Sequence, residues 1–141
     1  IHHLGRNKRK HNISMHLEDD LLMANMDARL IIQVLVNLIN NAIKYTHENS
    51  NISLNARRVE DKILIEVQDD GNGVLHPDQL FEMFYTENNR GGDTRRGMGL
   101  GLSLCKSIIQ SHGGTIWVEN VTPHGACFKF VLDAVEVKLY E

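Results

Sequence analysis

Three asparagines interrupt the most apolar helical run of this chain, residues 27–45. At about 100° per residue, apolar side chains cover more than half of the helix circumference, so most of the helix must be buried. The remaining stripe carries uncharged amides and one lysine, where a surface helix would carry Glu and Lys. The stripe consists of Gln33, Asn37, Asn40, Asn41 and Lys44. The fold must therefore bury a long helix and still provide partners for the polar side chains of the stripe. Asp27 is the expected N-cap of this helix.

The amide stripe has two explanations. Each asparagine alone is most simply a buried side chain that bonds to neighbouring backbone. As a set they favour a ligand, because Asn37 and Asn41 are one turn apart and Lys44 follows on the same face. An amide oxygen is a hard, neutral ligand that suits Mg²⁺, and lysine suits phosphate. The pattern fits a site where Mg²⁺ and a triphosphate lie along the helix.

The rest of the chain predicts a single mixed α/β domain. Alternating or β-rich runs predict strands at 12–17, 51–58, 62–68, 115–120 and 125–132, with the middle pair forming a hairpin. Further helices are expected at 77–84 and from Gly99 to the glycine pair 113–114. Residues 85–98 are polar and glycine-rich, which predicts a mobile loop, and residues 1–11 are expected to be a linker.

Composition excludes several classes of protein. A formal charge of −3 gives no reason to expect nucleic acid or an anionic membrane as a partner. No apolar run approaches the ~18 residues of a membrane span. Cys105 and Cys127 lack the spacing of metal ligands and suit buried thiols in a reducing compartment. The chain begins at Ile1 without methionine, so we expect a piece of a longer protein.

Two glycine-rich stretches suggest nucleotide contacts. In the first, Asp69 ends a strand and Gly71 and Gly73 follow, so the carboxylate could accept from the exocyclic amino group of adenine. An ordinary Asp-Gly turn is the structural alternative. In the second, Gly97, Gly99 and Gly101 alternate before a helix, where exposed backbone amides can bind an anion. The alternative there is a flexible loop that joins the helix through close-packed glycines. No Walker-type GK[ST] follows.

The order and spacing of these motifs resemble one known family. The segments LVNLINNAIKYT, DDGNGV, LFEMFY, GMGLGLSLCKSIIQSHGGTIWVEN and GACFKFVL are similar to the catalytic ATP-binding domain of bacterial sensor histidine kinases. That domain belongs to the GHKL superfamily, shared with DNA gyrase, the ninety-kilodalton heat-shock chaperone and MutL. The resemblance covers residues 12–132 and implies an α/β (α+β) sandwich of the Bergerat type, with about five strands in a mixed sheet under three helices. The GACF stretch is similar to that of potassium-sensing KdpD kinases.

The resemblance also implies roles for individual residues. Asn41 matches the Mg²⁺-binding asparagine and Asn37 its companion near metal and phosphates. Lys44 matches a phosphate contact and Tyr45 the aromatic residue beside the nucleotide. Asp69 matches the aspartate that reads adenine. The remaining matches are Gly71 and Gly73 for the adenine wall, Phe81 and Phe84 for the phenylalanine box, and Gly97, Met98, Gly99, Leu100, Gly101 and Leu102 for the glycine box that faces the phosphates.

Two departures from the family pattern matter. Thr86 stands where the family often has a basic residue, so Arg90, Arg95 or Arg96 would have to supply that charge. The phosphorylated histidine of the family lies on a separate upstream helix, and His2, His3 and His11 lie in the polar linker and are poor candidates.

The implied function is that of a protein histidine kinase's catalytic domain with ATP and Mg²⁺ as cofactors. It would transfer the γ-phosphoryl to a histidine on the parent's dimerisation domain, with a response regulator downstream. Residues 1–11 would be the linker and 12–141 the catalytic domain, which would be cytoplasmic even if the parent is anchored in the inner membrane. An anti-sigma-factor serine kinase, a nucleotide-sensing module and a gyrase-type ATPase are the alternatives.

Overall fold

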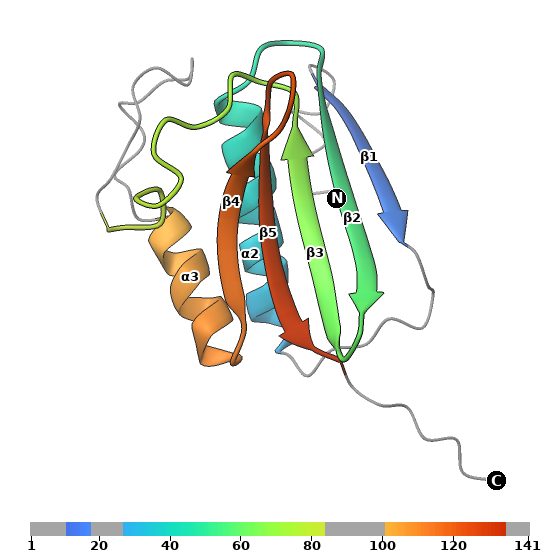
Figure 1. The fold of residues 1–141 in the computed structure, drawn as a ribbon, viewed down its shortest axis with the longest axis vertical. Coiled ribbons are helices and arrows are strands. Elements are labelled where there is room, and N and C mark those ends of the chain that lie inside the picture. The colour runs from blue at the N-terminus through green and yellow to red at the C-terminus, as the bar shows by residue number, and fades with distance from the viewer. Residues whose placement is uncertain (1–10, 18–26, 84–100, 135–141) are drawn as a thin grey trace, which may run out of the picture.

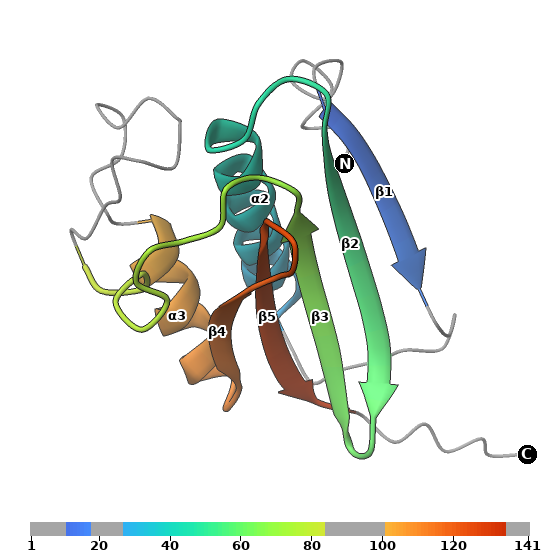
Figure 2. The ribbon, with the colours of Figure 1, turned by 45° about the horizontal axis from the view of Figure 1, so that its top comes forward.

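A computed structural model describes residues 11–17, 27–83 and 101–134. They form a five-stranded sheet with two helices on one face (Figure 1; Figure 2). In chain order the elements are β1 (His11–Leu17), α2 (Ala28–Lys44), β2 (Ser50–Val59), β3 (Lys62–Asp69), α3 (Gly101–Ser111), β4 (Thr115–Asn120) and β5 (Ala126–Asp133). The strand order is β1-β2-β3-β5-β4. Only the β1–β2 pair is parallel, so the sheet is mixed, as predicted.

The observed elements agree with those expected from the sequence, with one exception. All five strands lie within one residue of their expected ends. Residues 77–83 form successive turns in place of the short helix expected at 77–84, with bonds from Gln79 N to His76 O and from Glu82 N to Gln79 O, both 3.0 Å. A segment this short does not sustain a helix by itself, and burial of Leu80 and Phe81 determines its path instead.

Local signals explain where α2 and the hairpin begin and end. The Asp27 side chain accepts from Arg29 N at 3.0 Å, which satisfies one of the free donors at the helix N-terminus. The β2–β3 hairpin closes between Val59 and Lys62, and Glu60 takes a positive φ of 57° in the two-residue turn. Both predictions, the N-cap and the hairpin, are confirmed.

The core lies between the sheet and the two helices. Phe128 and Phe130 of β5 are fully buried, as are Leu38 of α2 and Ile109 of α3. The helices run antiparallel, because the start of α2 meets the end of α3. There the backbone N–H of Asp27 donates to His112 Nε2 at 2.9 Å. This packing leaves the C-terminal half of α2 beside the beginning of α3.

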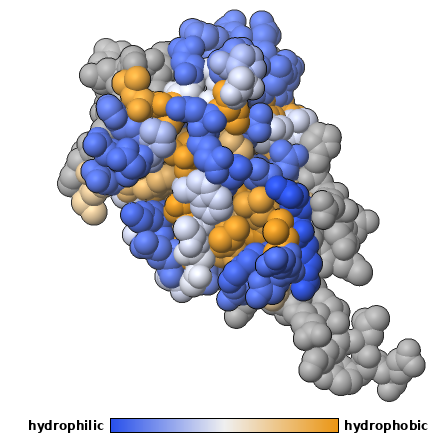
Figure 3. Space-filling model, in the orientation of Figure 1, coloured by the Kyte–Doolittle hydropathy of each residue, from blue (hydrophilic) through white to orange (hydrophobic). Residues whose placement is uncertain are grey.

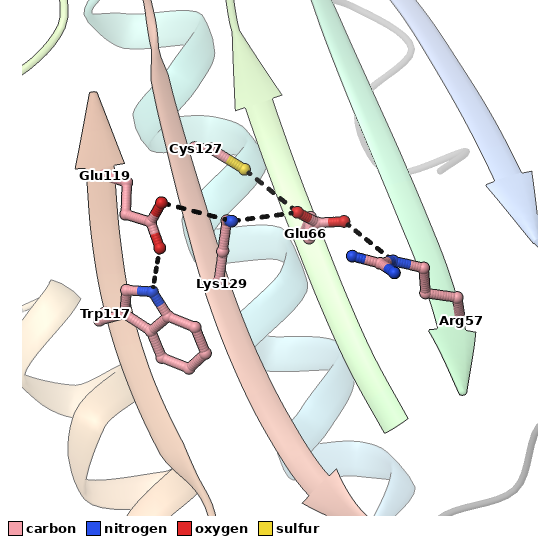
Figure 4. A network of polar contacts seen from close by, with 6 residues as sticks. All are labelled: Arg57, Glu66, Trp117, Glu119, Cys127 and Lys129. Atoms are coloured by element: carbon pink, nitrogen blue, oxygen red, sulfur yellow. Dashed lines mark hydrogen bonds and ion pairs between the residues drawn. The ribbon is translucent and has the colours of Figure 1, made fainter. Parts of the chain in front are cut away.

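The opposite face of the sheet carries a polar network that joins four strands (Figure 4). Glu66 lies 3.7 Å from Arg57 Nε and 3.5 Å from Lys129 Nζ, and Lys129 in turn lies 3.5 Å from Glu119. Trp117 Nε1 donates to Glu119 at 2.6 Å, and this bond lowers the pKa of that carboxyl. Hydrophilic side chains cover much of this face, with hydrophobic ones between them (Figure 3). The network makes this face a solvated surface rather than a second core.

Both cysteines are buried free thiols, as predicted. Cys105 of α3 packs against α2, with its Sγ 3.9 Å from Val34 O, and burial raises its pKa to about 11. Cys127 lies on the polar face of β5, 3.8 Å from Glu66 Oε2. Burial first, and then the Glu66 charge, raise its pKa to about 12. No helix in the described ranges is long and apolar enough to cross a membrane.

Candidate functional site

The C-terminus of α2 and the end of β3 meet at one end of the molecule, together with the starts of β1 and β5 (Figure 1). Asp69, the last residue of β3, is only 2% exposed. Its Oδ1 accepts from Gly71 N at 2.9 Å and from Ala126 N at 3.2 Å. Two backbone donors therefore hold this carboxylate in a fixed orientation, which is what recognition of a base edge requires.

Three positions near Asp69 are glycines because a side chain would not fit at any of them. A Cβ at Gly71 would lie 2.8 Å from Thr46 Cγ2, and a Cβ at Gly73, whose φ is +82°, would lie 2.6 Å from Asn120 Oδ1. A Cβ at Gly125, with φ +123°, would lie 2.2 Å from Asp69 O. The protein itself fills the space beside these three glycines, so the fold requires them whether or not a nucleotide binds.

Asn120 was not identified from the sequence as part of this region. Its Oδ1 accepts from Val74 N at 2.7 Å, and its Nδ2 donates to Val74 O at 2.9 Å. This pair of bonds ties the end of β4 to the loop that follows Asp69. The two residues are 46 positions apart, and no local pattern signals their contact.

The residues of the amide stripe of α2 differ in burial. Asn37, Asn41 and Lys44 are partly buried, whereas Asn40 is exposed. Asn41 Nδ2 is buried and has no hydrogen-bond partner within the described segments. Lys44 Nζ stands 5.1 Å from the centroid of the buried Tyr45 ring, a cation–π distance. A helix face that keeps a buried amide nitrogen without a partner among the described residues is not optimised for stability alone.

The start of α3 lies toward this stripe. The antiparallel helices pair Asp27 with His112, and Val34 with Cys105, so one further turn brings Gly101 level with the last turns of α2. A Cβ at Gly101 would meet nothing within 4 Å, and Leu102 packs against the core. The other glycine-box residues, Gly97, Met98, Gly99 and Leu100, lie outside the described residues.

Part of the predicted lid region can also be located. Phe81 is buried and meets Phe128 edge to face, with ring centroids 6.0 Å apart. That contact fixes the last described turn before the predicted lid against the core. Phe84, Thr86 and the three arginines Arg90, Arg95 and Arg96 lie outside the described residues.

Two further residues of this region were missed in the sequence. Thr46 follows Tyr45 and donates from Oγ1 to Ala42 O at 2.7 Å. His11, expected to end the linker, is instead the first residue of β1 and is buried. Its Nε2 lies 2.9 Å from Thr46 Oγ1. Both contacts depend on tertiary packing, so the sequence pattern could not reveal them.

The donor set fits Mg²⁺ and a nucleotide better than a transition metal. The described part of the chain contains no group of three His, Cys, Asp or Glu that could hold a metal ion. Asn41 instead presents an amide whose nitrogen has no partner among the described residues and whose oxygen is a hard, neutral donor of the kind that Mg²⁺ binds. Asn37 and Lys44 on the same stripe add an amide and a cation for phosphate.

Comparison with known proteins agrees with this geometry. The family described as histidine kinase-, DNA gyrase B-, and HSP90-like ATPase matches residues 26–136. A sensor protein KdpD of Clostridium acetobutylicum is 37% identical over 124 residues, covering 86% of this chain and 14% of its own length. An adaptive-response sensory kinase SasA of Crocosphaera subtropica is 46% identical over 110 residues, covering 75% of this chain and 28% of its own length.

Solved structures agree as well. The catalytic domain of histidine kinase ThkA superposes with a TM-score of 0.80 at 30% identity, covering 92% of this chain and 86% of that domain. ThkA has also been solved in complex with the response regulator TrrA, where the TM-score is 0.77 and this chain covers 37% of the kinase. The chain thus spans less than a third of the two curated kinases and most of a catalytic domain. It belongs to the histidine kinase-, DNA gyrase B-, and HSP90-like ATPase family, as a catalytic domain of the sensor histidine kinase type.

Proposed function

We propose that this domain binds Mg·ATP between Asn37, Asn41 and Lys44 of α2 and the start of α3, and supplies the γ-phosphoryl group to a histidine on a separate domain of its parent protein. The observation that carries the proposal is the buried amide nitrogen of Asn41, which has no hydrogen-bond partner among the residues that the structure describes. The helix keeps this group although an apolar residue would stabilise the apo fold. A function as a metal ligand gives a reason to keep the amide, because its oxygen then contributes free energy in the Mg·ATP complex.

Each residue of the site has a task in this proposal. Asn41 and Asn37 hold Mg²⁺ and phosphate oxygens without adding negative charge beside a polyanion, and the cation neutralises charge on the transferring group. Lys44 contacts phosphate, and the backbone amides at the start of α3, including Gly101, face the phosphates. Asp69 accepts from the amino group of adenine, in a carboxylate geometry fixed by Gly71 and Ala126. Catalysis is then positioning and charge neutralisation, without a protein nucleophile.

The chemistry of Asn37 favours transfer over hydrolysis. An amide cannot accept a proton from water, so the stripe lacks the general base that an efficient ATPase needs. The acceptor is therefore a nucleophile delivered from outside this domain, which we infer to be a histidine of the dimerisation domain, with a response regulator as the next acceptor. A serine kinase or a nucleotide sensor on the same fold remains the rival interpretation.

A reconstitution separates these functions. We expect this domain, mixed with a separately produced dimerisation domain of a related sensor kinase and γ-labelled ATP, to produce acid-labile, base-stable label, because phosphohistidine has that stability. The dimerisation domain with its histidine replaced by alanine is the control. Acid-stable label would indicate a serine kinase. Steady phosphate release by the isolated domain would indicate a gyrase-type ATPase, and ATP binding without label would indicate a sensor.

Substitution of Asp69 tests the adenine contact. We expect Asp69→Asn to reduce the preference for ATP over GTP by about tenfold or more, because one carboxylate oxygen becomes an amide donor that faces the adenine amino group. Titration of both nucleotides with Mg²⁺ measures it. Asp70→Asn is the matched control, since Asp70 accepts from Asn51 N and Nδ2, both at 3.0 Å, on the exposed side. An unchanged preference in Asp69→Asn would remove this residue from the pocket.

A further inference from the structure

His11 and Asp69 are the only buried polar or charged side chains in the described residues. They lie at the same end of the sheet, where β1 begins and β3 ends. His11 is 8% exposed, although β1 is an edge strand and the adjacent Asn12 and Ser14 are exposed. Burial of a histidine at a sheet edge calls for an explanation in terms of its partner.

The partner is Thr46, and the direction of the hydrogen bonds follows from chemistry. The Thr46 hydroxyl has one hydrogen, and it donates this hydrogen to Ala42 O, which can only accept and lies 2.7 Å from Oγ1. The hydroxyl therefore accepts from His11 Nε2, 2.9 Å away. His11 therefore carries a proton on Nε2, and its buried Nδ1 has no partner in the described part of the chain.

Thr46 in turn packs against the turn that holds Asp69. A Cβ at Gly71 would lie 2.8 Å from Thr46 Cγ2, so the threonine methyl is in direct contact with Gly71. The amide of Gly71 donates to Asp69 Oδ1 at 2.9 Å. A continuous set of contacts thus leads from β1, through the end of α2, to the carboxylate.

We infer that His11 is a positioning residue for the nucleotide pocket: it fixes the Thr46 side chain, and through it the Gly71 turn and the Asp69 carboxylate. The inference rests on the proposed function and adds a residue that makes no contact with nucleotide. In the observed rotamer, the Thr46 hydroxyl donates to Ala42 O and accepts from His11 Nε2, and the Cγ2 methyl lies at Gly71. Loss of the histidine donor leaves only the bond to Ala42 O to hold that rotamer, so the support that Asp69 receives through Gly71 weakens.

The test compares His11→Leu with His11→Gln in the whole chain. Wild-type binding of Mg·ATP is measured first, and its absence would refute the proposed function before the role of His11 is addressed. We expect His11→Leu to lower the ratio of ATP to GTP affinity by about fivefold to tenfold, the effect of one lost hydrogen bond. His11→Gln, whose amide N–H can replace Nε2–H, should retain a ratio within about twofold of wild type.

Two further variants separate positioning from general damage to the strand. Asn12→Ala removes a neighbouring side-chain bond of β1, to Asn49 O at 3.3 Å, and should leave the nucleotide ratio unchanged. Thr46→Val keeps the Cγ2 methyl and replaces the hydroxyl with a second methyl, so its effect should not add to that of His11→Leu. If His11→Leu fails to fold, Thr46→Val alone should lower the ratio. An unchanged ratio in the folded variants, or an equal change in Asn12→Ala, would overturn the inference.

Discussion

Replacement of Asn41 with alanine should weaken Mg·ATP binding by about 100-fold or more, since even groups that only support a metal ligand are worth about 10-fold to 100-fold. The free energy of unfolding of the apo domain should stay the same or rise, because the substitution removes a buried amide nitrogen that has no partner in the described segments. Calorimetric titration and thermal unfolding measure the two quantities. Opposite signs for binding and stability are the signature of a residue retained for function.

Two controls make this prediction specific. Asn40→Ala removes the adjacent but exposed amide of the same helix and should leave binding within about twofold of wild type. Chelation of Mg²⁺ should reduce the difference in ATP affinity between wild type and Asn41→Ala, because the contact that the variant loses is to the cation. Equal weakening in both variants, or a difference that survives chelation, would mean that Asn41 acts through the helix and not through the metal.

Gly125→Ala should destabilise the fold by about 3 kcal/mol or more, a large effect for the addition of one methyl group. A Cβ there would lie 2.2 Å from the Asp69 carbonyl oxygen, which belongs to the backbone and cannot turn aside. The residue also has a φ of +123°, which disfavours any side chain. Denaturant unfolding of wild type and variant gives the difference in free energy.

Two other glycines separate the causes of this loss. Gly113 has a φ of +75° but open space around its Cβ position, so Gly113→Ala should lose only about 1 kcal/mol. Gly101 begins α3 and has open space with no positive φ, so Gly101→Ala should be neutral or slightly stabilising in unfolding experiments. A Gly125→Ala variant as stable as Gly113→Ala would show that the turn yields and that the contact with Asp69 is dispensable.

The sequence predicted the elements well because their signals are local. Strand alternation, the Asp27 cap and the turn of the hairpin depend on neighbours within a few positions, and the structure confirms all three. The segment 77–83 differs because burial of Leu80 and Phe81, rather than helical propensity, decides its path. Propensity is a weak guide where a short segment is held by tertiary contacts.

The site was predictable only in part, for the same reason. Spacing along one helix placed Asn37, Asn41 and Lys44 together, and the helix keeps that spacing. The glycines after Asp69 were also identified, but the sequence could not say whether ligand or protein occupies the space beside them. The structure places Thr46 and Asn120 there. His11 was missed because its inferred role depends on a contact with Thr46, which lies 35 positions away at the end of α2.

The buried thiols of Cys105 and Cys127 can report on local opening of this domain. Alkylating reagents react with the thiolate, which is scarce at neutral pH when the pKa is about 11 for Cys105 and about 12 for Cys127. Modification must therefore wait for an opening event. Cys105 lies between the helices and Cys127 on the polar face of the sheet, so the first follows separation of the helical layer and the second follows displacement of the side chains that cover it on the sheet. Labelling rates can thus distinguish which layer loosens first, without any engineered probe.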